Sequence, residues 1–374
     1  MAPPLRSDRA YVRTQPVPPA SPPAMAAGPI AWMRRNLFAT PFSAALTLLT
    51  VYLLYLTIPP LIDWAFVSAV WEGHSNRDCQ GISGACWAVI EVRFDQFIYG
   101  FYPVDQRWRV NLTFVLFLLN LVPILSDRVP GRSHAIVWIV TGFPLLAYFL
   151  LHGGLGLSVV ETDRWGGLML TLVLASVSIL LSLPFGILLA LGRRSTMPII
   201  RIACIAFIEL WRAVPLITVL FMSSFMLPLF MPEGVNFDEL VRALVGFTMF
   251  ASAYMAEVVR GGLQALPKGQ NEAARALGLG FWQSMRLIVL PQALKIVIPG
   301  IVNTFIGLFK DTTLVVFIGL LDPIGLAGAI RASTDWQGIY WELFIFIGLM
   351  FFIFCFSMGR YSLYLEKKLQ REHR

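Results

Sequence analysis

The chain has few of the charged residues that a soluble protein of its length carries on its surface. Only 14% of its 374 residues are charged, whereas 57% are hydrophobic, and the mean hydropathy is +0.70. A soluble domain carries about a quarter charged residues. The apolar residues also form long runs without charge, so most of this chain is expected to be surrounded by lipid.

Other absences exclude whole classes of chemistry. The four cysteines lack zinc-type spacing and the four histidines are scattered, so we expect no metal site. There is no Gly-x-x-x-x-Gly-Lys-Ser/Thr phosphate loop, no His-Glu-x-x-His and no Gly-x-Ser-x-Gly pattern. We predict no catalytic residue, no bound cofactor and no enzyme. The net charge of +7 is spread over loops between apolar runs, which does not favour nucleic-acid binding.

Eight apolar runs are candidate membrane helices, because about 20 residues cross a hydrocarbon core of ~30 Å. The 42–58 run suffices only with its flanking residues, and the 111–125 run is short. The sequence therefore predicts an all-α integral membrane protein with about eight transmembrane helices. The predicted spans are 42–58, 111–125, 135–151, 166–191, 199–231, 240–259, 293–321 and 340–364. The 199–231 run is interrupted by Glu209, Arg212 and Pro215.

The distribution of Lys and Arg predicts the orientation. Basic residues gather in alternate loops and at the C-terminus, at 34–35, 128–132, 193–194, 260–286 and 366–374. The intervening loops carry few, apart from the 63–109 loop, which has four arginines. Cytoplasmic loops are the ones enriched in Lys and Arg. Both termini are therefore expected in the cytoplasm, with the 63–109 loop outside.

The charged loop 267–291 contains two predicted helices. Asn271 is the expected N-cap of the first, and Glu272 follows at its positive end. Ala273, Ala274 and Leu277 are expected on one side of that helix, where small alanines allow close approach to a partner. Gly278 suits a left-handed stop. A second helix is expected from Phe281 to Val289, ending before Pro291.

The pattern Glu272-Ala273-Ala274, Gly278 and Ile288-Val289-Leu290-Pro291 has three residues before Gly278 and nine after it. It resembles the EAA loop of permease subunits in binding-protein-dependent ABC importers. In that family the loop seats in a groove of the ATPase subunit. The resemblance implies an ATPase-coupling role for Glu272, Ala273, Ala274, Gly278, Leu290 and Pro291.

The resemblance also implies a domain organisation and a set of partners. Residues 165–365 resemble the five-span core of a type I importer permease, and 31–164 would be an extension with three spans and a large periplasmic loop. Residues 1–30, rich in Pro and Ala, are expected to be disordered, and 366–374 form a basic cytoplasmic tail. Expected partners are an ABC ATPase that uses ATP and Mg²⁺, a second permease subunit, a periplasmic amino-acid-binding protein and the lipid bilayer.

The substrate class rests on resemblance alone. Residues 84–90 and 100–103 are similar to the larger permease of general L-amino-acid importers of Gram-negative bacteria, which implies the bacterial inner membrane. The alternative is a secondary amino-acid transporter that works without an ATPase. Such a transporter is often built from inverted repeats, and we find no corresponding pair of halves.

Charges within the apolar runs mark further candidate sites. Lys310 and Asp311 lie in the seventh run, where an ionisable group costs at least ~2.5 kcal/mol unless it pairs or lines a cavity. Lys310, Asp311, Thr312 and Thr313 resemble a stretch of polar amino-acid permeases, which favours a translocation pathway over a structural ion pair. Glu209–Arg212 and Glu257–Arg260 are spaced to form local ion pairs, the second expected to be solvated.

Cys79 and Cys86 lie in the polar 63–109 loop, on the predicted outer side, where disulfides persist. The short loop between them permits a bridge, and two free thiols are equally compatible with the sequence.

Overall fold

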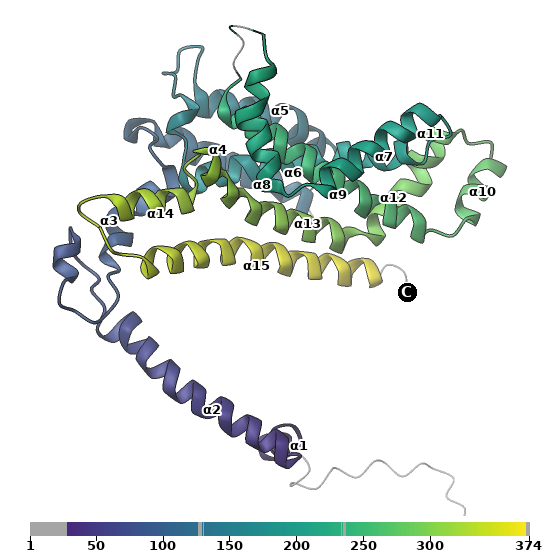
Figure 1. The fold of residues 1–374 in the computed structure, drawn as a ribbon. Coiled ribbons are helices and arrows are strands. Elements are labelled where there is room, and N and C mark those ends of the chain that lie inside the picture. The colour runs from purple at the N-terminus through teal and green to yellow at the C-terminus, as the bar shows by residue number, and fades with distance from the viewer. Residues whose placement is uncertain (1–27, 126–128, 130, 233, 235–236, 372–374) are drawn as a thin grey trace, which may run out of the picture. The chain divides into compact units, whose positions relative to one another are not determined.

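The computed structural model describes residues 28–125, 129, 131–232, 234 and 237–371. Three predicted features lie outside the described residues: nearly all of the 1–30 tail, Arg128, and the last residues of the basic C-terminus. Regular secondary structure in the described part of the chain is helical, apart from isolated bridges (Figure 1).

The chain divides into two compact units, Met1–Ala69 and Val70–Arg374. The first unit contains α1 (Pro29–Asn36) and α2 (Pro41–Ile62). A reciprocal capping box between Thr40 and Ser43 starts α2. None of the α2 residues is buried, although the helix is apolar on every side. A helix with no polar face and no covering element in its unit is suited to lipid.

The second unit holds the remaining helices. They are α3 (Ala88–Tyr99), α4 (Arg107–Leu125), α5 (Arg132–His152), α6 (Gly167–Arg193), α7 (Pro198–Ala213), α8 (Leu216–Phe221), α9 (Glu239–Ala265), α10 (Gly269–Ala276), α11 (Phe281–Ser284), α12 (Leu290–Ile296), α13 (Ile298–Asp311), α14 (Pro323–Ala332) and α15 (Trp341–Arg371). Single π-helical turns follow α8 and α11, and a 3₁₀ helix, Thr312–Ile318, follows α13.

Seven helices in the described residues are long and apolar enough to cross a membrane, and α7 with the helical stretch from Leu216 to Phe230 gives an eighth candidate. The prediction of an all-α protein with about eight spans is confirmed. The fifth run is not one straight helix, because its two parts are bent by 106°. Arg212 and Pro215 lie at this break, and proline cannot continue the helical hydrogen bonding.

The second span begins earlier than the predicted residue 111. It starts at Val104, because the structure accommodates Arg109 inside the protein. The Arg109 guanidinium is fully buried and donates to the Ser158 carbonyl at 2.7 Å and to Gln106 Oε1. Because protein groups accept its hydrogen bonds, the Arg109 side chain can be buried within the span at a much lower cost in free energy.

The centre of the second unit is the packing of α6 against α9, which lie side by side along their lengths (Figure 1). Small residues allow the close approach. A Cβ atom on Gly186 would come within 2.7 Å of the Met255 side chain, and Ala175, Ala190 and Ala251 are buried near this contact. Small residues at helix crossings are the usual means by which membrane helices approach closely.

The α3 segment (residues 70–106) packs on the 323–347 region of α14 and α15. The Asn76 amide donates to the Asp335 carbonyl at 2.6 Å, and the Cys86 amide donates to Glu342 Oε1 at 2.9 Å. Trp336 is fully buried in the apolar cluster that joins the two segments. The predicted outer loop is therefore folded onto the last helices of the chain.

Candidate coupling site

The loop between α9 and α12 contains the short helix α10. Its C-terminus forms a Schellman motif, with the Gly278 amide donating to the Arg275 carbonyl at 2.9 Å and the Leu279 amide to the Ala274 carbonyl at 3.1 Å. Gly278 has φ +75°, a conformation that costs an L-residue roughly 1–2 kcal/mol. The left-handed stop predicted at Gly278 is thus present.

The start of α10 differs from the prediction. Lys268, not Asn271, is the N-cap residue, and its backbone is already helical. Pro267 fixes the entry of the chain, and Gln270 in the first turn accepts from Gln292 Nε2 at 3.1 Å. The first turn of α10 thus contacts α12, and Asn271 lies inside the helix.

The predicted small-residue face of α10 is divided between two sides. Ala274 is fully buried against its own chain, whereas Glu272, Ala273 and Leu277 are exposed, Leu277 at 76%. The expectation that both alanines face outward is wrong for Ala274. Successive helix residues differ by about 100° in direction, so adjacent alanines seldom share one face.

Apolar side chains next to α10 were not singled out by the sequence. Phe281, Trp282 and Leu287 are 58%, 68% and 65% exposed at this end of the molecule, and together with Leu277 they extend its apolar surface. The aromatic pair directly after Gly280 is the sequence signal that identifies them. Exposed aromatic groups on a charged loop are typical of a binding surface.

The second helix of the loop does not end before Pro291. The chain continues from α11 through a π turn, Met285–Val289, into α12, with Pro291 in the first turn of α12. A π turn widens the helix by one residue, which accommodates proline without the clash it causes in a regular helix. The helix is therefore continuous from the loop surface to the membrane region.

This helix is held against α9 by a close backbone approach. A Cβ atom on Gly262 would meet the Ala293 carbonyl oxygen at 2.5 Å. Gly262 is buried near the end of α9, and Ala293 is fully buried in α12. The loop and α9 therefore form a connected structure that can move together.

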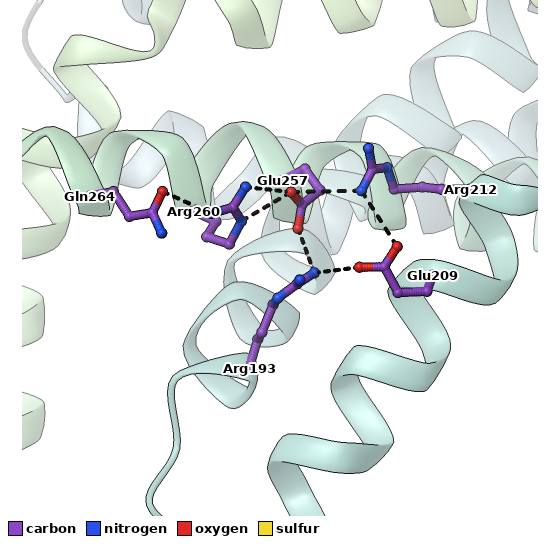
Figure 2. Close-up of polar contacts among 6 residues, drawn as sticks. All are labelled: Arg193, Glu209, Arg212, Glu257, Arg260 and Gln264. Atoms are coloured by element: carbon purple, nitrogen blue, oxygen red, sulfur yellow. Dashed lines mark hydrogen bonds and ion pairs between the residues drawn. The ribbon is translucent and has the colours of Figure 1, made fainter.

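Five charged residues, called here the arginine cluster, join three helices next to this loop. They are Arg193, Glu209, Arg212, Glu257 and Arg260. Glu257 lies between three arginines (Figure 2), with N–O distances of 2.7 Å to Arg193, 3.6 Å to Arg212 and 2.7 Å to Arg260. The expected pair of Glu257 with Arg260 is present, but Glu257 is mostly buried rather than solvated, and it contacts two further arginines.

Glu209 is more exposed than Glu257 and contacts fewer arginines of the arginine cluster. Its carboxylate lies 3.0 Å from Arg193 and 4.0 Å from Arg212, and its side chain is 54% exposed, against 17% for Glu257. The local pairing predicted for Glu209 and Arg212 is present but long. Glu257 is therefore the residue that connects α6, the end of α7 and α9.

Lys310 and Asp311 do not form an ion pair in the described part of the chain. Lys310 is exposed on the surface of this chain, and Asp311 is half-buried beside it. The Thr312 hydroxyl is buried and donates to the Phe309 carbonyl at 2.8 Å, and the Thr313 hydroxyl donates to the Lys310 carbonyl at 2.9 Å. The helix changes from α to 3₁₀ at these residues.

Cys79 and Cys86 are joined as a disulfide in the α3 segment, with their Cα atoms 5.8 Å apart. Asp78 beside them accepts hydrogen bonds from the backbone amides of His74 and Ser75, which lower the pKa of its carboxyl group. The rings of Trp71 and Trp87 stack on each other, and Trp87 directly follows Cys86 in the chain.

Comparison with known proteins identifies the family. Residues 182–371, about half of the chain, match the family described as binding-protein-dependent transport system inner membrane component. The chain belongs to this family. The matched region contains α10, the arginine cluster and the 310–313 stretch. Permeases of this family work with a separate ATPase subunit and a binding protein.

Curated relatives of this permease extend the match over the whole chain. It is 54% identical to an inner membrane amino-acid ABC transporter permease protein of Escherichia coli K12, over 90% of this chain and 92% of the relative. It is 44% identical to a glutamate/glutamine/aspartate/asparagine transport system permease protein of Rhodobacter capsulatus, over 98% of this chain and 100% of the relative.

A shorter relative shows that the family also has smaller members. The permease is 35% identical to a probable glutamine ABC transporter permease protein of Bacillus subtilis, which covers 54% of this chain while 91% of the relative is matched. The chain is thus a multi-pass inner-membrane permease subunit of an amino-acid ABC importer, as predicted, and it leaves ATP hydrolysis to its partner.

Proposed function

We propose that the 267–291 loop is the site through which the ATPase subunit moves this permease. The observation that carries the proposal is the surface beside α10, where exposed Leu277, Phe281, Trp282 and Leu287 surround a helix fixed by a glycine stop. Ala274 locks α10 to its own chain, while Glu272 and Ala273 face outward for contact with the ATPase. Leu290 and Pro291 carry the motion on into α12.

The arginine cluster supports a path for that motion. The loop is rigidly joined to α9 at Gly262, and Glu257, less than two turns earlier in α9, contacts Arg193 of α6 and Arg212 at the α7–α8 break. A displacement of the loop therefore reaches the broken span through ion pairs. Discrete contacts between packed helices are the usual means of coupling two distant sites.

We propose an orientation in which both termini are cytoplasmic. The basic loop that contains α10 and α11 lies at one end of the second unit, and α3 lies at the other (Figure 1). Placing the basic end inside follows the positive-inside rule. The Cys79–Cys86 disulfide then lies in the periplasm, which permits stable disulfides.

The transported substrates are proposed to be polar L-amino acids of the kind named for the Rhodobacter relative. In the proposed mechanism a periplasmic binding protein delivers the amino acid, and two permease subunits enclose the pathway. The second subunit is a different permease chain. Residues 310–313 line the pathway at the change from α to 3₁₀ helix, and this chain itself holds no cofactor, with ATP and Mg²⁺ bound by the ATPase.

The coupling proposal is tested with Gly278→Val and the matched control Gly280→Val. Valine at 278 is strained by φ +75°. Gly280 has φ −66°, and a Cβ atom there would meet only the Gln283 side chain, at an ordinary contact distance of 3.7 Å. We expect Gly278→Val to reduce ATPase co-purification and ATP-driven uptake on the order of tenfold. Gly280→Val should change both by less than twofold.

Three outcomes would contradict the coupling proposal. The first is normal uptake and normal ATPase association in Gly278→Val. The second is protease or tag accessibility that places residues 268–290 outside the cell. The third is uptake that survives ATP depletion but stops when the proton gradient is removed, which would favour a secondary transporter.

A further inference from the structure

An apolar groove of about 460 Å³ lies between the α4–α5 hairpin and the core helices α6 and α9. Its walls include Phe117 and Phe143, whose ring centroids are 5.8 Å apart, and the aliphatic side chains of Leu172, Val173 and Leu244. The lining residues come from the beginnings of α4, α6 and α9 and from the end of α5. Because these ends lie together, the groove occupies one half of the membrane thickness.

At that same end, hydrogen bonds join the start of α4 to the end of α5 and to the loop that follows it. The Tyr102 hydroxyl donates to the Leu151 carbonyl at 2.7 Å, and Arg109 donates to the Ser158 carbonyl at 2.7 Å. Helices α4 and α5 pack along their lengths, but α5 meets α6 only locally. An empty apolar groove would lose dispersion contacts along its walls. Water needs polar partners, which the aromatic and aliphatic side chains of these walls do not supply. The groove is therefore suited to a hydrocarbon chain.

The polar end of the groove carries two carboxylates and an imidazole. Glu161 and Asp238 are both exposed there, and Asp238 also caps α9 and accepts from the Thr162 hydroxyl. His152 stacks on Tyr148 with ring centroids 5.1 Å apart. The Nδ1 atom of His152 is shielded from solvent and has no hydrogen-bond partner among the described residues.

We propose that this groove binds one acyl chain of a phospholipid whose headgroup carries a primary ammonium group, such as a phosphatidylethanolamine. The ammonium group lies between Glu161 and Asp238. The two carboxylates disfavour a headgroup that is only anionic. Assignment to the outer leaflet rests on the orientation proposed above, whereas the binding itself depends on no transport activity.

The test uses the full permease with its partner subunits, in nanodiscs made from equal amounts of phosphatidylethanolamine and phosphatidylglycerol. The complex is transferred to mild detergent, and the retained lipids are counted by native mass spectrometry. Wild type should retain phosphatidylethanolamine over phosphatidylglycerol about fivefold, the size of an exposed ion-pair effect.

Two variants separate the headgroup from the chain. Glu161→Gln combined with Asp238→Asn removes both charges and keeps the helix cap, because Asn caps as well as Asp. It should lower the preference to about onefold, and Asp163→Asn, next to the groove but not lining it, should leave it unchanged. Val177→Trp fills the groove and should abolish retention of either lipid, whereas Leu188→Trp, on the lipid-exposed part of α6, should not.

Equal retention of the two lipids by wild type would overturn the proposal, whatever the variants do. Unchanged lipid retention in Val177→Trp would also overturn it. If Val177→Trp instead loses the second permease subunit and keeps its lipid, the groove is a protein interface. Failure of the coupling test at Gly278 would leave these lipid measurements unaffected.

Discussion

Replacing Glu257 with Gln tests the arginine cluster most directly. The cluster has three arginines and two glutamates, a net charge of +1, and the substitution raises this to +2. Breaking a buried ion pair costs about 3–5 kcal/mol, and an exposed pair about 0–1 kcal/mol. The Glu257 side chain is 17% exposed and its arginine partners 25–34%, so we expect an intermediate cost of about 2 kcal/mol.

A change of that size corresponds to about thirtyfold in a conformational equilibrium. We therefore expect Glu257→Gln to uncouple the transporter. In proteoliposomes containing the ATPase and the binding protein, the amount of amino acid imported per ATP hydrolysed should fall at least tenfold. The basal ATPase rate should stay close to wild type, because the nucleotide site lies in another subunit.

The matched control is Glu209→Gln in the same cluster. Glu209 is 54% exposed and contacts only two arginines, so its removal should cost less than about 1 kcal/mol and change import by less than fivefold. If Glu209→Gln reduced the import-to-hydrolysis ratio as strongly as Glu257→Gln, net charge alone would explain the effect. The assignment of Glu257 as the connecting residue would then be refuted.

Three other changes should have measurable effects. Asp311→Asn is expected to reduce the initial rate of uptake by on the order of tenfold without changing subunit assembly. Burial raises the pKa of Asp322 to about 7. Its stabilising protonated form is thus fully present below about pH 3.8 and lost as pH rises through about 7. About 3 kcal/mol of this loss falls between pH 5 and 8, and Asp322→Asn should remove it from thermal unfolding over that range. Replacing Cys79 and Cys86 with Ser should destabilise the α3 segment by about 2 kcal/mol, measured by its resistance to protease.

Each of these three predictions would be contradicted by a specific measurement. Normal uptake kinetics in Asp311→Asn would remove that residue from the pathway. A wild-type unfolding temperature that does not fall between pH 5 and 8 would contradict the role of Asp322, whose Oδ2 has no partner among the described residues. Unchanged protease resistance after loss of both thiols, or free thiols in membranes kept oxidised, would show that the bridge does not hold the segment.

The membrane spans could be predicted because their signal is local. An uninterrupted apolar run is visible in any window of about 20 residues, and all the predicted runs correspond to helices. The stop at Gly278 could be predicted for a similar reason, since only glycine adopts that backbone conformation without cost. The bend near Pro215 was visible as an interruption, but its angle depends on packing against other helices.

Features that depend on distant residues could not be predicted. The first turn of α10 accepts a hydrogen bond from Gln292 on another helix. The helix continues through Pro291 by means of a π turn that no residue pattern marks. Glu257 has its predicted neighbour Arg260, but Arg193 is 64 residues away along the chain. Spacing in a sequence identifies neighbours on one helix and says nothing about which helices meet.

The attachment of the α3 segment to the end of the chain limits how this protein can be shortened. Deleting the α3 segment would uncover Trp336 and Leu326. It would also remove the Cys86 backbone amide, which donates a hydrogen bond to the Glu342 carboxylate. A minimal version that keeps only residues 165–374 would therefore need new polar side chains on that surface. In this permease the α3 segment is part of the protein interior, and the last two helices are folded around it.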